Sequence, residues 1–213
     1  MSNDALIDEL SSGLVPVRPR NVAREAAWLA GLGVLELIIF LALGMMRPDM
    51  AAVIGQPFMW WKLGSLALLV AISGGTAVQS FSPTISPRRG LILTAGLAGA
   101  VVAAGLALGL VEQGAPGLSE RLMPAHGLLC AGSIVVLSLP MLVGLSVFMR
   151  RGASAHAEGS ALAVGLAGGS WGALVFAFCC PVNDPVYILF WYSAAFAITA
   201  SLARLVLPRF AAL

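Results

Sequence analysis

Long apolar stretches recur along almost the whole chain, and they limit what it can fold into. Of the 213 residues, 59% are hydrophobic and only 10% are charged, whereas soluble domains carry about a quarter charged residues. A stretch of about 20 apolar residues is long enough to cross a hydrocarbon core about 30 Å thick. Backbone groups in lipid must be paired within the segment, so these stretches are predicted to be helices. The composition therefore predicts an all-α membrane protein whose surroundings are the lipid bilayer.

Six membrane-spanning helices are predicted, joined by short polar or proline-rich connections. Their ranges are Ala26–Met46, Phe58–Ser80, Leu91–Val111, Ala125–Phe148, Ser160–Cys179 and Val186–Leu207. We expect one six-helix bundle over residues 26–213, preceded by a cytoplasmic tail over residues 1–25. The first span is expected to be retained, because no small-residue cleavage site of a signal peptide follows it. Pairs of glycines four residues apart, such as Gly165 and Gly169, predict close helix packing.

The basic residues predict which helix ends face the cytoplasm, because Lys and Arg are retained on that side. Most of the 12 basic residues fall at one level of the predicted bundle: Arg18, Arg20, Arg24, Arg88, Arg89, Arg150, Arg151, Arg204 and Arg209. The three at the other level are Arg47, Lys62 and Arg121. Both termini are therefore predicted to be cytoplasmic. No basic patch is of the kind that binds nucleic acid, so no direct nucleic-acid partner is expected.

Aromatic residues cluster near the outer ends of two predicted spans. They are Trp60, Trp61, Trp191 and Tyr192. Amphipathic rings are enriched at the headgroup level of membranes, so we expect these side chains to lie there.

Glu36 is the acidic residue that lies clearly inside a predicted span. An intramembrane ionisable group is costly and is a functional candidate by default. A single carboxylate can also be protonated or contact a polar group such as Ser73 or Thr76 on the second span. We expect no intramembrane Lys, Arg or second acid beside it, and this argues against an ion or proton pathway.

The first 20 residues predict a short amphipathic helix that Gly13 would end. Its narrow apolar face is formed by Leu6, Ile7, Leu10 and Leu14. A helix of about ten residues is marginal on its own. One interpretation is a tail whose leucines lie against the bilayer surface. The other is a helix that folds into a groove of a soluble cytoplasmic partner, which its acidic polar face favours, since surface-binding helices are usually basic.

Two of the three cysteines are predicted to meet near the outer face. Cys130 and Cys180 both fall about 30 Å above the inner turn that joins the fourth and fifth spans. His126 lies one helical turn from Cys130, so His126, Cys130, Cys180 and Asp184 are expected to converge on a shallow pocket. Thiolate and imidazole suit Cu, Zn, Cd and related ions. A disulfide and a pair of free buried thiols remain the alternatives, and no constitutive cofactor is expected.

Three segments together carry a family resemblance. The chain begins with LIDELSSGLVPVRP, opens its fourth span with HGLLCAGS and links its last two spans with CCPVNDPVYILFWY. With six spans, this combination resembles the NrsF family of bacterial anti-sigma-F factors over essentially the whole chain. The resemblance implies a bacterial inner-membrane protein, not an enzyme, that holds an extracytoplasmic-function sigma factor through its tail. Pro16 and Pro19 then join the four apolar residues as part of the sigma-binding segment.

The resemblance also implies how the sigma factor is released. Heavy-metal or oxidative stress is sensed by two cysteines that face the periplasm, and these correspond to Cys130 and Cys180. Cys179 stands where the family has histidine, so a third thiol can compete for pairing.

Two other classes of function stay open on the sequence. A small permease for metals or solutes would need polar residues along a path through the bundle, where only Glu36 qualifies. A membrane thiol-disulfide oxidoreductase would need two reactive cysteine pairs, whereas the chain has three cysteines and no CxxC spacing.

Overall fold

The computed structural model describes residues 7, 11–12, 20–111 and 121–211, which form helices and no strands. Six of the helices are long and apolar enough to cross a bilayer. They are α2 (Val22–Ala42), α4 (Pro57–Ser80), α5 (Arg88–Val111), α7 (Pro124–Arg151), α8 (Ala157–Ala177) and α9 (Pro185–Ala211). The short helix α3 (Met50–Val53) follows α2. The predicted all-α class and the six long apolar helices are confirmed.

The first long helix ends four residues before the predicted boundary. The Leu43 N–H donates to the Ile39 carbonyl at 3.0 Å, and Gly44 follows with a φ of 71°. Glycine takes this left-handed conformation at little cost, and it commonly ends a helix there. The apolar pattern alone does not contain this stop signal.

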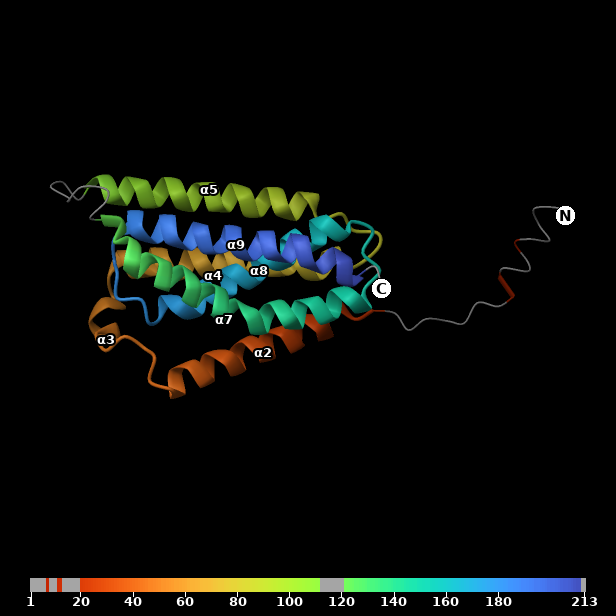
Figure 1. The fold of residues 1–213 in the computed structure, drawn as a ribbon, viewed down its shortest axis with the longest axis horizontal. Coiled ribbons are helices and arrows are strands. Elements are labelled where there is room, and N and C mark those ends of the chain that lie inside the picture. Colours follow the sequence, from red (N-terminus) through yellow and green to blue (C-terminus); the bar gives the residue numbers. More distant parts are fainter. Residues whose placement is uncertain (1–6, 8–10, 13–19, 112–120, 212–213) are drawn as a thin grey trace.

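Helix α8 lies at the centre of the bundle, packed against α4, α7 and α9. Figure 1 shows α5 along one edge of the bundle and α2 along the opposite edge. Glycines allow the close approach of α8: a Cβ on Gly165 would lie 2.5 Å from the Ala200 Cα, and one on Gly172 would lie 2.5 Å from the Ile134 carbonyl oxygen. The predicted packing through small residues is therefore confirmed for α8.

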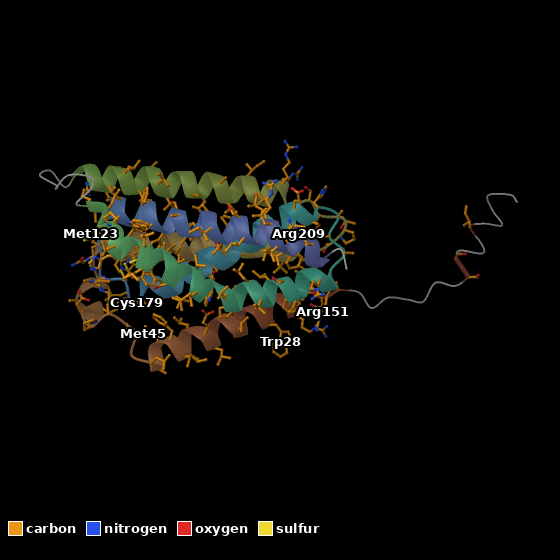
Figure 2. All side chains as sticks on the ribbon, in the orientation of Figure 1. Trp28, Met45, Met123, Arg151, Cys179 and Arg209 are labelled. Carbon is orange, nitrogen blue, oxygen red and sulfur yellow. The ribbon has the colours of Figure 1, made fainter. Side chains whose placement is uncertain are left out.

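The bundle has two chemically different ends (Figure 2). Met45, Met123 and Cys179 lie at one end, which we call the cysteine end, while Arg151 and Arg209 lie at the other, the arginine end. The cysteine end is formed by the connections α2–α4, α5–α7 and α8–α9, and the arginine end by the start of α2 and the connections α4–α5 and α7–α8.

The aromatic residues near the cysteine end do not all face outward. Trp60 is exposed, but Trp191 and Tyr192 are buried in the bundle. The Trp191 N–H donates to the Leu122 carbonyl at 2.8 Å. The side chains of Trp191 and Tyr192 complete the core between α7, α8 and α9, while their predicted position at the headgroup level stays a prediction.

Candidate functional site

The structure brings Cys130 and Cys180 together at the cysteine end. Cys130 is half-buried on α7, and Cys180 is fully buried in the loop between α8 and α9. Cys130 packs against the buried core cluster that contains Cys180. The Tyr187 hydroxyl donates to the Cys130 sulfur at 3.1 Å. All three cysteines of the chain are free thiols in this structure.

The loop is shaped by the residues that end α8 and begin α9. The Cys180 N–H donates to the Phe176 carbonyl at 3.0 Å, which closes the last turn of α8 before Pro181. Asp184 caps α9, because its Oδ1 accepts from the Val186 N–H at 2.8 Å. The CCPVNDP sequence thus holds Cys180 between two helix termini, with its side chain turned into the core.

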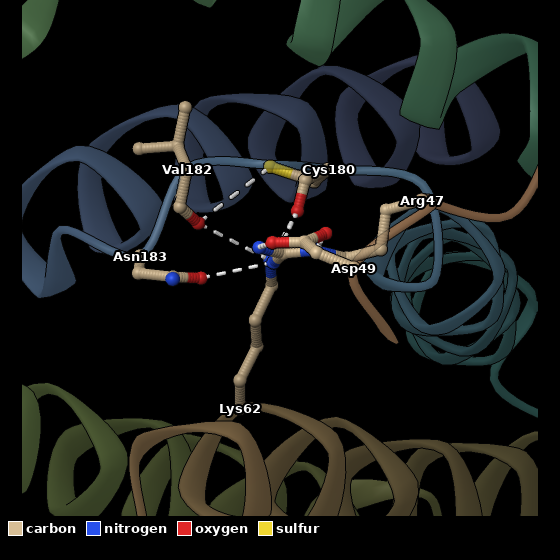
Figure 3. Close-up of polar contacts among 6 residues, drawn as sticks. All are labelled: Arg47, Asp49, Lys62, Cys180, Val182 and Asn183. Carbon is tan, nitrogen blue, oxygen red and sulfur yellow. Dashed lines mark hydrogen bonds and ion pairs between the residues drawn. The ribbon is translucent and has the colours of Figure 1, made fainter. Parts of the chain in front are cut away.

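Lys62 is buried directly against this loop (Figure 3). Only 1% of its surface is exposed, and its Nζ donates to the Cys180 carbonyl at 3.4 Å and the Val182 carbonyl at 3.5 Å. Its Nζ also lies 5.9 Å from the centre of the Tyr192 ring. Lys62 belongs to α4, and it contacts the cysteine loop, whereas Glu36 contacts Trp171.

Arg47 reaches the same loop from the α2–α3 connection. Its Nη1 donates to the Cys180 carbonyl at 3.2 Å and to the Asn183 side-chain oxygen at 3.0 Å. Its backbone N–H donates to the Phe178 carbonyl at 3.0 Å. The Arg47 Nε and Nη2 donate to the two carboxylate oxygens of Asp49, both at 2.7 Å. This bidentate arrangement is a strong one. Arg47 itself is only 4% exposed, so it joins the α2 end rigidly to the cysteine loop.

Arg121 completes the set of basic residues around the loop. Its guanidinium binds both carboxylate oxygens of Asp184, at 2.7 and 2.9 Å. Every basic residue that the sequence places at the outer level therefore contacts residues 180–184.

The predicted four-residue metal pocket is not assembled. Asp184 is occupied by Arg121, and His126 is exposed to the surroundings. Within the part of the chain that the structure describes, no three His, Cys, Asp or Glu residues form a group that could hold a metal ion. What the geometry offers a soft ion is the pair of thiols, Cys130 and Cys180, with Tyr187 beside it.

The two adjacent cysteines differ in their electrostatic surroundings. The hydrogen bond from Cys130 lowers the pKa of the Cys180 thiol; burial opposes this, and the positive charge of Lys62 adds to it. Burial, together with the neighbouring Cys180, raises the pKa of the Cys179 thiol to about 11. Since the thiolate is the nucleophile and the metal ligand, Cys180 is the member of this adjacent pair whose reactive form is electrostatically favoured. Cys179 is half-buried and packs against the same core.

Glu36 lies away from this site. Its Oε2 accepts from the Trp171 N–H at 2.9 Å, which joins the middle of α2 to α8. Ser73 instead contacts Ser170 at 3.0 Å, and the Thr76 hydroxyl donates to the Ile72 carbonyl. The polar partner of Glu36 is therefore the indole of Trp171 and not the second span.

Most of the predicted sigma-binding segment lies outside the described residues. This holds for Leu6, Leu10, Leu14, Pro16 and Pro19. Ile7 is described as helical and 60% exposed. The sequence-based prediction of a binding helix stays a prediction.

Sequence reasoning missed four residues that shape the thiol site. Lys62 and Arg47 counted only toward orientation, and Tyr192 was assigned to the membrane interface. Tyr187, which contacts Cys130, was not singled out. One signal was available: Lys62 falls six residues into α4, and an intramembrane lysine is a functional candidate by default.

Comparison with known proteins shows which family the chain belongs to. A family described as "Negative regulator of sigma F" (NrsF) matches residues 10–212. The chain is 34% identical over 203 residues to the "Anti-sigma-F factor NrsF" of Caulobacter vibrioides (strain NA1000 / CB15N), covering 91% of each chain. No solved structure matches the chain. The chain therefore belongs to the NrsF family of negative regulators of sigma factors, which are regulatory proteins and not enzymes.

Proposed function

We propose that the protein is an inner-membrane anti-sigma factor that holds an extracytoplasmic-function sigma factor and releases it when Cys130 and Cys180 are oxidised or bind a soft metal ion. The observation that carries this proposal is that Cys130 packs against the core cluster that contains Cys180, where Tyr187 bonds the Cys130 sulfur and Lys62 and Arg47 bond the Cys180 carbonyl. Arginines are retained on the cytoplasmic side of membranes. The thiols then face the periplasm, while both termini lie in the cytoplasm where a sigma factor is found.

The amino-terminal tail binds the sigma factor. Leu6, Ile7, Leu10 and Leu14 are the anchors of a helix that docks in a groove of the partner, followed by Pro16 and Pro19. The acidic residues around these anchors then face a basic rim on the sigma factor.

The thiol pair has two simple reactions. With hydrogen peroxide, the S–H bonds of Cys130 and Cys180 break, one S–S bond forms, and the two electrons and two protons reduce the peroxide to two waters. With a divalent soft ion such as Cd²⁺ or Zn²⁺, two sulfur–metal bonds form and two protons leave. Either reaction ties α7 to the α8–α9 loop and changes the surroundings of the Cys180 carbonyl, which Arg47 and Lys62 contact.

Helix α2 carries the change to the tail, because it follows the tail directly in sequence. At the cysteine end it is held through Arg47, and in its middle by the Glu36–Trp171 bond. At the arginine end, Arg20 donates to the Val78 carbonyl at 2.9 Å and pairs with Glu25. Beside these points an open groove of about 520 Å³ is lined by α2, α4, α7 and α8. A helix held by few polar contacts beside an open groove moves more readily than a closely packed one.

The energy needed for this switch is within reach of the chemistry. Shifting a two-state equilibrium from 1:99 to 99:1 requires about 5.5 kcal/mol of differential affinity. A covalent S–S bond or two thiolate–metal bonds supply a difference of this size.

The decisive experiment replaces both thiols. The double variant Cys130→Ser, Cys180→Ser should keep the sigma factor bound, and sigma-dependent transcription should no longer respond to cadmium or peroxide. The Cys179→Ser variant is the matched control and should still respond. An unchanged response of the double variant would exclude these thiols as the sensor.

Two further measurements test the parts of the scheme separately. Replacing Leu10 and Leu14 with Glu should raise sigma-dependent transcription without any inducer, and continued repression would refute the docking helix. Impermeant thiol labelling of intact spheroplasts tests the orientation. It should spare a cysteine introduced next to Met1, and labelling there would reverse the assigned sidedness.

A further inference from the structure

A wide groove runs between α5 and α8 at the arginine end, remote from the thiol site. Its volume is about 1040 Å³. It exists because α5 packs against α4 and α9 and lies at the edge of the bundle, where it does not close over the first half of α8.

The charged residues that line this groove, and most of its polar ones, lie at its mouth. They are Ser86, Arg88, His156 and Glu158. The deeper walls are apolar and include Leu91, Ile92, Ala98, Leu162 and Leu166. Thr94 also lines the wall, but its hydroxyl is satisfied, since it donates to the Gly90 carbonyl at 2.9 Å. The lining of the groove thus changes from charged at the mouth to apolar further in. A lipid shows the same change from its headgroup to its acyl chains.

The depth of the groove matches one leaflet of a membrane. From Arg88 to Ala98 the wall rises ten residues along α5, which is about 15 Å at 1.5 Å per residue. Half of a hydrocarbon core about 30 Å thick has the same depth. An apolar groove on the side of a membrane-spanning bundle is filled by hydrocarbon and not by water, because water there would face apolar surface.

The charges at the mouth of the groove favour a negatively charged group there. Arg88 forms no ion pair with any described residue, and the Glu158 carboxylate is already bound by Arg204 at 3.0 Å. Two arginines and one glutamate leave a net positive charge at this level, next to His156. A basic pocket between helices on the cytoplasmic side is the chemistry that binds anionic lipid headgroups.

We propose that this groove is a binding site for an anionic phospholipid, whose phosphate contacts Arg88 and whose acyl chain lies along Leu91, Ile92 and Leu162. The site is independent of the thiol pair and of the sigma factor.

Native mass spectrometry of the purified full-length protein tests this directly. Phosphatidylglycerol and phosphatidylcholine with identical acyl chains are offered in equal amounts. The wild type should retain phosphatidylglycerol preferentially. The Arg88→Gln variant should bind it about five-fold more weakly, the effect of one basic side chain at an anionic lipid surface. Arg89→Gln is the matched control, because Arg89 lines a different hollow, and it should bind as the wild type does.

A second variant tests the acyl-chain wall. Ala95→Trp fills the groove from an exposed position of α5 and should reduce retention of both lipids, with unchanged helicity by circular dichroism. Equal retention of the two lipids by the wild type would overturn the proposal, as would equal losses in the Arg88 and Arg89 variants. A protein dimer that Ala95→Trp abolishes would assign the groove to a second copy and would also overturn it.

Discussion

Apart from Arg20, which bonds the Val78 carbonyl and Glu25, the basic residues at the two ends of the bundle have opposite surroundings. At the cysteine end, Arg47 and Lys62 are almost completely buried, and with Arg121 they bind the loop that carries Cys180. At the arginine end, basic residues such as Arg150, Arg151 and Arg204 are exposed. The height of a basic residue in the bundle therefore does not show its role. Its burial and its bonding partners do, because they distinguish a cation that holds the structure together from one that only sets the orientation in the membrane.

The difference follows from what each end must do. Exposed arginines at a membrane surface remain hydrated and need no fixed partner. A buried cation is expensive unless it is bonded, so its partners are held in one geometry. The cysteine loop gains a fixed conformation from this, because Arg47 and Lys62 bond the Cys180 carbonyl and Arg121 bonds Asp184.

The Arg47→Gln variant should show the largest effect. It removes charged hydrogen bonds to Cys180 and Asn183, each of which contributes about 1.5–3 kcal/mol when a charged group is involved. We expect a loss of about 3 kcal/mol in the stability of the cysteine end, measured by thermal unfolding in detergent. Arg150→Gln at the other end should leave stability unchanged, and equal effects of the two variants would contradict the comparison.

The same variant also tests the role of α2. With Arg47 removed, sigma-dependent transcription should rise without inducer, because α2 is no longer joined to the cysteine loop. Arg121→Gln cuts a different ion pair on that loop and should remain repressed and inducible. Membrane levels of both variants are checked by immunoblot. If Arg47→Gln stayed as repressed and as inducible as the wild type, α2 would not carry the signal.

The thiols of Cys179 and Cys180 should lose their protons at clearly different pH values. The hydrogen bond from Cys130 and the charge of Lys62 lower the Cys180 pKa, while burial raises the Cys179 pKa to about 11. Thiol reactivity rises with pH as the thiolate forms, so the half-maximal rate should come at a lower pH for Cys180, by more than about two units. Site-resolved alkylation by tandem mass spectrometry measures both midpoints. Coincident midpoints would show that the loop does not distinguish its two thiols.

Lys62→Met should raise the midpoints of both cysteines, because the charge of Lys62 lowers the pKa of Cys179 as well as that of Cys180. Without the buried ammonium the thiolate is less favoured, so the pH of half-maximal alkylation should rise by about one unit, equivalent to 1.36 kcal/mol. Methionine has a similar length and no charge, which keeps the packing against Tyr192 comparable. Replacing an exposed cation at the arginine end, as in Arg151→Gln, should leave the pH of half-maximal alkylation of Cys180 unchanged.

The sequence was sufficient to predict the helices, but not to predict which side chains contact the loop that carries Cys180. Apolar stretches about 20 residues long predict the six spans, and glycines four apart predict the packing of α8. Heights along neighbouring helices also predict that Cys130 and Cys180 meet. Helical periodicity does not show how each helix is rotated, so the burial of Lys62, the inward turn of Tyr192 and the outward position of His126 needed the structure. Arg47 lies in a connection, where no periodic pattern exists to place it.

The smallest effect is expected at the exposed ion pair of the arginine end. Arg204 and Glu158 are 3.0 Å apart, with side chains 58% and 72% exposed. Water and salt screen such a pair, and exposed pairs contribute at most about 1 kcal/mol. Glu158→Gln should therefore change thermal stability by less than about 0.5 kcal/mol, while freeing Arg204 to add to the positive mouth of the α5–α8 groove. Stronger retention of phosphatidylglycerol at unchanged stability would separate the two roles of charge at this end. A large stability loss would mean that this pair, like Arg47, has a fixed structural role despite its exposure.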